Sequence, residues 1–200
     1  MAPDPEGRET GDRKDPKKRP LTRPWPFPGG LAGELPARGE PGSFWEDRGD
    51  RRHCGIDLYT TAGSMVVAIE GGTVVRVGEA TSGLILPYWR TTSFVVVRTA
   101  SGLFWKYAEL AWVAVRQGDR VAAGDEIGRL GEVIDPSKVG ADAPPYIRRL
   151  VAAGRTSMLH LEVYAAPPPD DGEYLGGNWF GEGRPRGILD PGAYLRPSGV

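Results

Sequence analysis

The chain has 200 residues, with 25 Lys and Arg against 26 Asp and Glu, so its formal net charge is -1. This length suits one domain with its own core, and the balanced charge gives no overall field that favours nucleic acid or an anionic membrane. The single cysteine, Cys54, excludes an internal disulfide, and no stretch approaches the roughly 18 apolar residues that span a bilayer.

Residues 1–24 are predicted to form a disordered, charged leader. They hold five acidic residues, seven basic residues and five prolines, and they lack the apolar run of a secretory signal. A solvated tail is the favoured interpretation. Docking to a larger protein assembly through this segment is the alternative.

The ordered part is predicted to be an all-β domain over residues 25–165. Gly and Pro are abundant, at 29 and 19 residues, which favours short strands joined by turns. Apolar, β-branched runs at 56–59, 65–69 and 73–77 are separated by turn residues, as in antiparallel sheets. Residues 93–99 and 103–108 are predicted to pair through a hairpin turn at 100–102.

Two Gly-Asp pairs punctuate residues 113–128 and predict two tight turns. Asp119 and Asp125 are therefore interpreted as turn residues rather than catalytic ones. The same stretch also resembles biotinyl or lipoyl carrier domains. Those domains present a lysine on a tight hairpin, and neither Lys106 nor Lys138 sits in such a turn.

One short helix is predicted at 144–154, with prolines at its start and a glycine past its end. It lies in a long connection between strands, which either walls a binding groove or is a neutral surface excursion. Residues 166–200 carry several aromatic side chains and are predicted to wrap over the core.

The only two histidines fall in motifs that could form one metal site. The first motif is His53-Cys54-Gly55-Ile56-Asp57. The second places His160 in an alternating strand pattern over 158–163. Zinc suits imidazole and carboxylate ligands, and a three-ligand set of His53, Asp57 and His160 leaves a fourth position for water.

The geometry of a strand constrains this site. Residues four apart on a regular strand lie about 13 Å from each other, so the glycine between His53 and Asp57 is predicted to allow a bend. In the second motif, alternation places Met158, His160 and Glu162 on the face opposite the apolar residues. Glu162 is then near enough to His160 to act as its partner.

Several motifs in order resemble the lysostaphin/LytM-type zinc endopeptidases over about residues 45–195. They are the His53 motif followed by Ala68-Ile69-Glu70-Gly71-Gly72-Thr73-Val74, then Tyr107-Ala108-Glu109-Leu110, the Gly-Asp stretch at 118–128, Leu159-His160-Leu161-Glu162-Val163, and Asp190-Pro191. The resemblance implies antiparallel sheets with a groove, the duplicated hybrid motif of that family, and zinc held by His53, Asp57 and His160. It also implies peptidoglycan cross-link peptides as substrates.

The departures from that pattern concern catalysis. The family has histidines at the positions that Glu109 and Met158 occupy here. Methionine can neither transfer a proton nor donate a hydrogen bond, whereas glutamate can act as a general base beside zinc. Two functions therefore stay open: a zinc endopeptidase with Glu109 as substitute base, or an inactive module that binds cell-wall peptide or serves a cell-envelope or phage-like assembly.

The location follows from the resemblance alone. A cell-envelope target is implied, but no general secretory signal is visible, so delivery by a specialised route is a hypothesis. No nucleic acid partner and no membrane insertion are expected.

Overall fold

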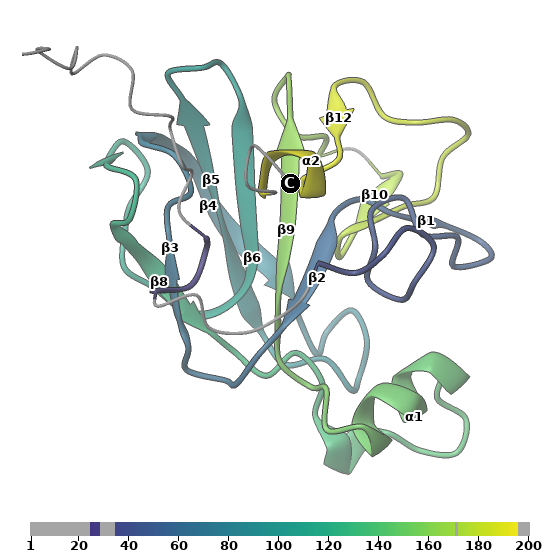
Figure 1. The fold of residues 1–200 in the computed structure, drawn as a ribbon. Helices are drawn as coiled ribbons and strands as arrows, with labels where there is room; N and C mark the ends of the chain where they lie inside the picture. Colours follow the sequence, from purple (N-terminus) through teal and green to yellow (C-terminus); the bar gives the residue numbers. More distant parts are fainter. Residues whose placement is uncertain (1–24, 29–34, 171, 196–200) are drawn as a thin grey trace, which may run out of the picture.

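The computed structural model describes residues 25–28, 35–170 and 172–195, and these form a largely antiparallel β structure (Figure 1). The all-β prediction is therefore confirmed. The predicted leader, residues 1–24, lies outside the described residues. The elements are β1 (Arg52–His53), β2 (Ile56–Tyr59), β3 (Met65–Val67), β4 (Gly72–Thr81), β5 (Thr92–Thr99), β6 (Phe104–Val113), β7 (Arg120–Val121), β8 (Glu126–Leu130), a 3-10 turn (Pro136–Lys138), α1 (Pro145–Ala152), β9 (Met158–Tyr164), β10 (Tyr174–Leu175), β11 (Asn178–Trp179), β12 (Ile188–Leu189) and α2 (Gly192–Leu195).

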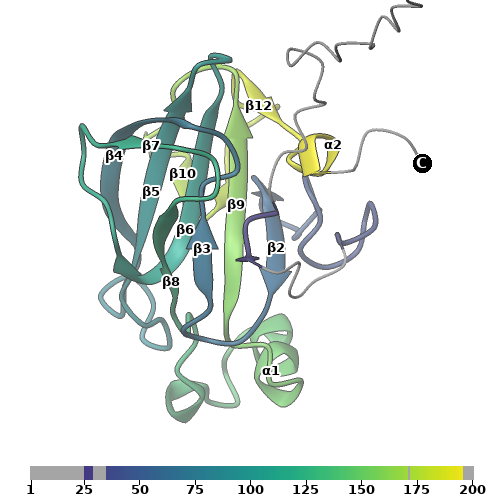
Figure 2. The same cartoon turned by 60° about the vertical axis from the view of Figure 1, so that its left-hand side comes forward.

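The main sheet has the strand order β12-β9-β6-β5-β4-β7, with β2 also paired to β9 and β8 paired to both β6 and β3. Figure 2 shows β5, β6 and β9 running side by side across it. The predicted hairpin is present, because β5 pairs with β6 and the chain turns at Gly102 with φ 84°. β3 pairs with β8 rather than with β4, so Gly71-Gly72 redirects the chain without closing a hairpin.

Strand β9 carries the alternation that the sequence predicts. Leu159, Leu161 and Val163 are fully buried in the main core, where they join Trp105 of β6. Burying one such aliphatic side chain contributes about 1.5–3 kcal/mol, so this face fixes the register of the strand. The opposite face of β9 thereby presents His160 toward His53 and Asp57.

The Gly-Asp pairs form turns, as predicted. Asp119 Oδ2 accepts a hydrogen bond from the Arg116 amide and Asp125 Oδ2 accepts one from the Ala122 amide, both at 2.8 Å. Lys106 is buried within β6, so it does not stand on the exposed hairpin that a carrier domain requires.

Helix α1 confirms the predicted helix, and it projects beyond the ends of β2 and β9 (Figures 1 and 2). In the C-terminal segment, β12 pairs with β9 and β11 pairs with β1. The division of the chain at residue 165 stays a prediction. Within the described ranges, no helix combines the length and apolarity needed to cross a bilayer.

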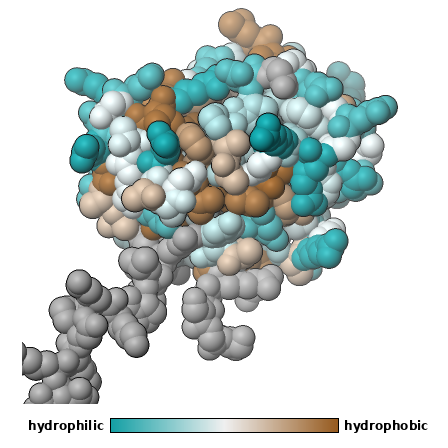
Figure 3. All heavy atoms as spheres, turned by 90° about the horizontal axis from the view of Figure 1, so that it is seen from above, coloured by the Kyte–Doolittle hydropathy of each residue, from teal (hydrophilic) through white to brown (hydrophobic). Residues whose placement is uncertain are grey.

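The large exposed hydrophobic residues are scattered over several elements. Figure 3 shows the same mixture on one face, where hydrophobic groups are separated by hydrophilic ones. Buried polar side chains, in contrast, gather on the paired strands β2 and β9, which carry Asp57, His160 and Glu162.

Candidate metal centre

His53 and Asp57 reach one point because the chain changes sheets between them. His53 ends β1 and pairs with Asn178 in the small sheet, whereas Asp57 lies in β2 directly opposite His160 of β9. Gly55 stands at the change. A Cβ there would lie 2.3 Å from the Leu161 carbonyl oxygen, so close backbone approach, rather than a left-handed φ, requires the glycine.

The three predicted ligand residues are brought together. His53 Nε2 lies 3.1 Å from Asp57 Oδ1, His160 Nδ1 lies 2.9 Å from the same oxygen, and the two nitrogens are 3.0 Å apart. All three side chains are buried. A histidine, a carboxylate and a second histidine thus present one triangle of ligand atoms.

The other nitrogen of each imidazole has a fixed partner. His53 Nδ1 donates to the Ser43 carbonyl oxygen at 2.9 Å, and His160 Nε2 donates to Glu162 Oε1 at 2.7 Å. With these protons in place, the nitrogens that face Asp57 carry lone pairs. Three electron-rich atoms therefore meet where only a cation or a proton can satisfy them.

This arrangement fits zinc. Zinc prefers nitrogen and oxygen ligands in a tetrahedron with bonds of about 2.0–2.1 Å, which places ligand atoms roughly 3.3 Å apart. The observed edges of 2.9–3.1 Å approach that spacing. His53, Asp57 and His160 would hold the ion, and the set leaves one position of the tetrahedron open.

The charges around the triangle support the same conclusion. Burial alone would lower the pKa of His160, but its hydrogen bonds to Asp57 and Glu162 and their charges raise the pKa to about 9. Burial would raise the pKa of Asp57, but the two histidines and Arg48 hold it well below its usual value. The centre therefore attracts positive charge, and a proton competes with a metal for Nδ1 of His160.

Asp57 is oriented from its far side by Arg48. Arg48 donates to Asp57 Oδ2 at 3.1 Å, and it is held in turn by Glu46 and by the Asn178 side chain. Oδ1 is thereby left to face the histidines. Sequence reasoning missed Arg48, because it lies in an irregular segment without periodicity.

Glu162 is the centre of a buried hydrogen-bond network behind His160, as the alternation predicts. Besides His160, Tyr164 donates to Glu162 Oε2 at 2.6 Å, and Tyr174 donates to Oε1. Burial would raise the pKa of Glu162, but Lys106 and His160 hold it lowered, so the carboxylate is ionised. The network fixes the ring of His160 and its tautomer.

We expect Glu162→Gln to weaken zinc binding by about 10- to 100-fold, because a neutral amide orients His160 less firmly and makes its nitrogen less basic. Competition with a chromophoric chelator measures this affinity. Glu132→Gln, a change at an exposed residue paired with Arg90, serves as the control and should leave the affinity unchanged. Equal affinities in both variants would contradict the assigned role of Glu162.

Gly177 leaves room for the ring of His160. A Cβ at this position would lie 2.5 Å from His160 Nε2, and the backbone φ is 77°. We expect Gly177→Ala to cost roughly 2–4 kcal/mol of unfolding free energy, from strain plus the clash. Gly183→Ala is the matched control, since φ is 73° there and nothing lies within 4 Å. Equal losses in urea denaturation would show that the ring does not occupy this space.

Glu109 lies beside the triangle through an irregularity of β6. Ala108 pairs with His160, and Glu109 follows with φ 73°, a left-handed conformation that is rare outside glycine. The strand alternation breaks there, because Tyr107 and Leu110 both enter the core. Ala108 and Glu109 can therefore both lie on the side of the metal centre.

The carboxylate of Glu109 is held by two threonines. Glu109 Oε2 accepts hydrogen bonds from Thr92 at 2.7 Å and from Thr81 at 3.3 Å. Burial raises the pKa of Glu109 above its usual value, although the bond from Thr92 opposes the shift. Neither threonine stands out in the sequence, because their roles depend on the pairing of β4 with β5.

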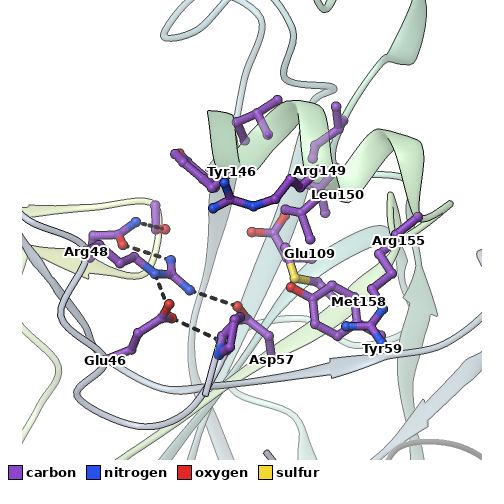
Figure 4. A pocket seen from close by; sticks show the side chains of 18 of the residues that line it. Glu46, Arg48, Asp57, Tyr59, Glu109, Tyr146, Arg149, Leu150, Arg155 and Met158 are labelled. Carbon is purple, nitrogen blue, oxygen red and sulfur yellow. Dashed lines mark hydrogen bonds and ion pairs between the residues drawn. The ribbon is translucent and has the colours of Figure 1, made fainter. Parts of the chain in front are cut away.

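A cavity of about 580 Å³ opens beside these groups. Asp57, Glu109 and Met158 line it, and helix α1 forms one wall, so the insertion does shape the groove (Figure 4). Met158 packs toward the apolar cluster under α1. Asp57 is the member of the triangle that borders the cavity.

Further residues have structural roles or border the cavity. Cys54 is fully buried as a free thiol, and it is not part of the metal cluster. Trp89 lines the cavity, whereas Trp105 lies in the main core. Tyr88, the neighbour of Trp89, packs against the apolar cluster under α1.

Comparison with known proteins agrees with this architecture. Residues 51–140 match the model of peptidase family M23. The match includes His53, Asp57 and Glu109 but ends before His160, which only the structure places in the same centre. No curated protein sequence matches the chain significantly.

Among solved structures, cbpa from L. salivarius REN is 22% identical, with a TM-score of 0.51 over 88% of this chain and 95% of that chain. The antimicrobial peptidase lysostaphin from Staphylococcus simulans is 19% identical, with a TM-score of 0.49 over 82% of this chain and 49% of that chain. A solution structure of lysostaphin is 20% identical, with a TM-score of 0.44 over 72% of this chain. The chain spans 43% of that lysostaphin chain.

The family match covers the first ligand motif, and the described fold supplies the antiparallel sheets and the groove that the resemblance implies. The family match over residues 51–140 thus supports the resemblance inferred from the sequence. Over those residues the chain is similar to peptidase family M23, and its antiparallel fold agrees with the lysostaphin/LytM type.

Proposed function

We propose that the chain is a zinc-dependent endopeptidase that cleaves cross-link peptides of peptidoglycan. The observation that carries the proposal is the triangle of His53 Nε2, Asp57 Oδ1 and His160 Nδ1, with edges of 2.9–3.1 Å, at the border of a cavity. The family match supports a metallopeptidase-like domain. The choice of metal, bond and substrate belongs to the proposal.

When bound, zinc supplies Lewis-acid activation of the scissile carbonyl and of water. Thr92 and Thr81 hold Oε2 of Glu109, which leaves Oε1 to accept a proton from the attacking water and to deliver it to the leaving amine. Arg48 keeps Asp57 oriented, and Glu162 keeps His160 in the required tautomer. The apolar residues of the cavity exclude water around the peptide.

The second candidate is a module that binds cell-wall peptide without cleaving it. Met158 favours this function, because its side chain cannot stabilise a developing oxyanion and the family has a histidine at that position. The same fold and the same zinc ligands would then serve recognition, alone or within a larger assembly.

Turnover distinguishes the two candidates. Purified cross-linked muropeptides are incubated with the zinc-loaded chain, with the chain after chelation, and with the chelated chain after zinc is restored. If the chain is an endopeptidase, new amino groups appear with the zinc-loaded chain and with the chain to which zinc is restored, but not with the chelated chain. Binding of muropeptides without any product in all three samples would favour the binding module.

A further inference from the structure

Helix α1 brings two arginines to the cavity, one on the helix and one just beyond it. Arg149 lies in the last turn of α1 and Arg155 follows the helix. Both line the cavity beside the metal centre, and Figure 4 shows their side chains extending over it. The insertion therefore contributes positive charge to the groove as well as a wall.

These two arginines stand outside the ion pairs of the described part of the chain. No described carboxylate forms an ion pair with Arg149 or Arg155, although Arg155 lies over the ring of Tyr59 at 5.3 Å. The other arginine of the cavity, Arg48, is already bound to Glu46 and Asp57. The α1 side of the groove thus carries two guanidinium groups outside any ion pair with a described residue, while the carboxylates of the cavity lie outside α1, at Glu46, Asp47, Asp57 and Glu109.

The surroundings of the two arginines suit a peptide. Ile147, Leu150 and Met158 supply apolar surface in the same cavity, and Tyr146 adds an aromatic ring. Tyr146 is itself fixed, because Arg51 donates to its hydroxyl at 3.0 Å. Two separate cations over an apolar floor match one or two carboxylates on a short chain, whereas nucleic acid requires an extended run of cations.

We infer that Arg149 and Arg155 bind a free carboxylate of the peptide substrate on the α1 side of the metal centre, and so select anionic peptides over amidated ones. This inference rests on the proposed function and adds the charge of the substrate to it. Guanidinium groups bind carboxylates through paired hydrogen bonds, which gives both affinity and orientation.

The test measures binding of two defined ligands to the full-length, zinc-loaded chain carrying Glu109→Gln, which limits turnover. One ligand is a muropeptide with a free carboxylate on its peptide, and the other is the same muropeptide with that carboxylate amidated. Calorimetry gives Kd for the parent and for Arg149→Gln, Arg155→Gln and the double variant. Arg148→Gln is the matched control, because Arg148 is an exposed neighbour on α1 that does not line the cavity.

We expect each single substitution to weaken binding of the carboxylate ligand about 5-fold and the double substitution about 25-fold. The amidated ligand should bind the parent about as weakly as the carboxylate ligand binds the double variant, and Arg148→Gln should change neither Kd by more than about 2-fold. Higher salt should reduce the preference for the carboxylate. The substituted residues are exposed, so the thermal unfolding midpoint should stay constant.

The outcomes separate this inference from the proposed function. Equal binding of the two ligands by the parent, or a Kd that the arginine substitutions leave unchanged, overturns the inference and leaves the endopeptidase proposal intact. Carboxylate-dependent binding without cleavage by the unsubstituted chain supports the inference and contradicts the endopeptidase. Binding of neither ligand contradicts both.

Discussion

Replacing His160 with alanine is expected to lower zinc affinity by about 10²- to 10³-fold and to abolish turnover at ordinary zinc concentrations. Four-ligand zinc sites bind with about 10–16 kcal/mol, so an equal share for each ligand is roughly 2.5–4 kcal/mol. His160 supplies Nδ1 to the triangle, and no other described imidazole or carboxylate is placed to substitute for it. Equilibrium dialysis with competing chelators measures the affinity.

Removal of His160 also takes a partner from the buried carboxylate of Glu162, so this variant can lose stability. His53→Ala provides the second arm, because the ring of His53 bonds only to the Ser43 carbonyl on its far side. Circular dichroism establishes that each variant is folded. Cys54→Ala, a change next to His53, is the control and should leave zinc affinity unchanged. A zinc affinity that falls in this variant but not in the histidine variants would refute the ligand assignment.

Replacing Glu109 with glutamine is expected to reduce kcat by about 10²- to 10³-fold without changing zinc affinity. The amide retains the shape of the side chain and can still bond to Thr92 and Thr81, but it cannot accept the proton of water. The rate of muropeptide cleavage, followed by chromatography, measures the effect. Glu79→Gln changes an exposed carboxylate on β4, which pairs with β5 rather than with β6, and should leave kcat unchanged.

The same substitution should not destabilise the fold. Because the pKa of Glu109 is raised in the folded chain, the folded state holds the proton of this carboxyl group more tightly than the unfolded state does. Ionisation of Glu109 therefore lowers the stability of the fold, and this loss is fully present above the folded pKa. At neutral pH, glutamine removes that cost, and the urea midpoint should stay constant or rise. A large loss of stability together with unchanged kcat would show that Glu109 is structural.

The regular parts of this domain could be predicted from the sequence because they follow local rules. The alternation of β9 placed Leu159 and Leu161 in the core and His160 beside Glu162, and the Gly-Asp pairs predicted the turns at Asp119 and Asp125. These features depend on side-chain period and turn chemistry, which a single sequence displays.

The residues that orient the metal ligands through hydrogen bonds could not be predicted in the same way. Arg48 contacts Asp57 from an irregular segment, and Tyr174 reaches Glu162 from β10, far along the chain from His53. Neither residue belongs to a periodic pattern. Their positions follow from the pairing of β1 with β11 and from the packing of the C-terminal segment, which local propensity does not encode.

Glu109 shows most clearly where prediction from strand alternation fails. A regular strand would turn its side chain to the same face as Tyr107, into the core. The left-handed backbone at Glu109 breaks that alternation. Only the resemblance to the lysostaphin/LytM-type endopeptidases pointed to this position, and the conformation explains how the carboxylate faces Thr92 and the cavity.

X-ray absorption spectroscopy of the zinc-loaded 200-residue chain measures the ligand set of the metal itself. We expect one zinc per chain, bound by nitrogen and oxygen atoms at about 2.0–2.1 Å with two imidazoles and no sulfur, and loss of that signal in His53→Ala. A chain that retains no zinc would contradict the account. So would a zinc spectrum with a sulfur ligand, or one that stays unchanged when His53 and His160 are replaced.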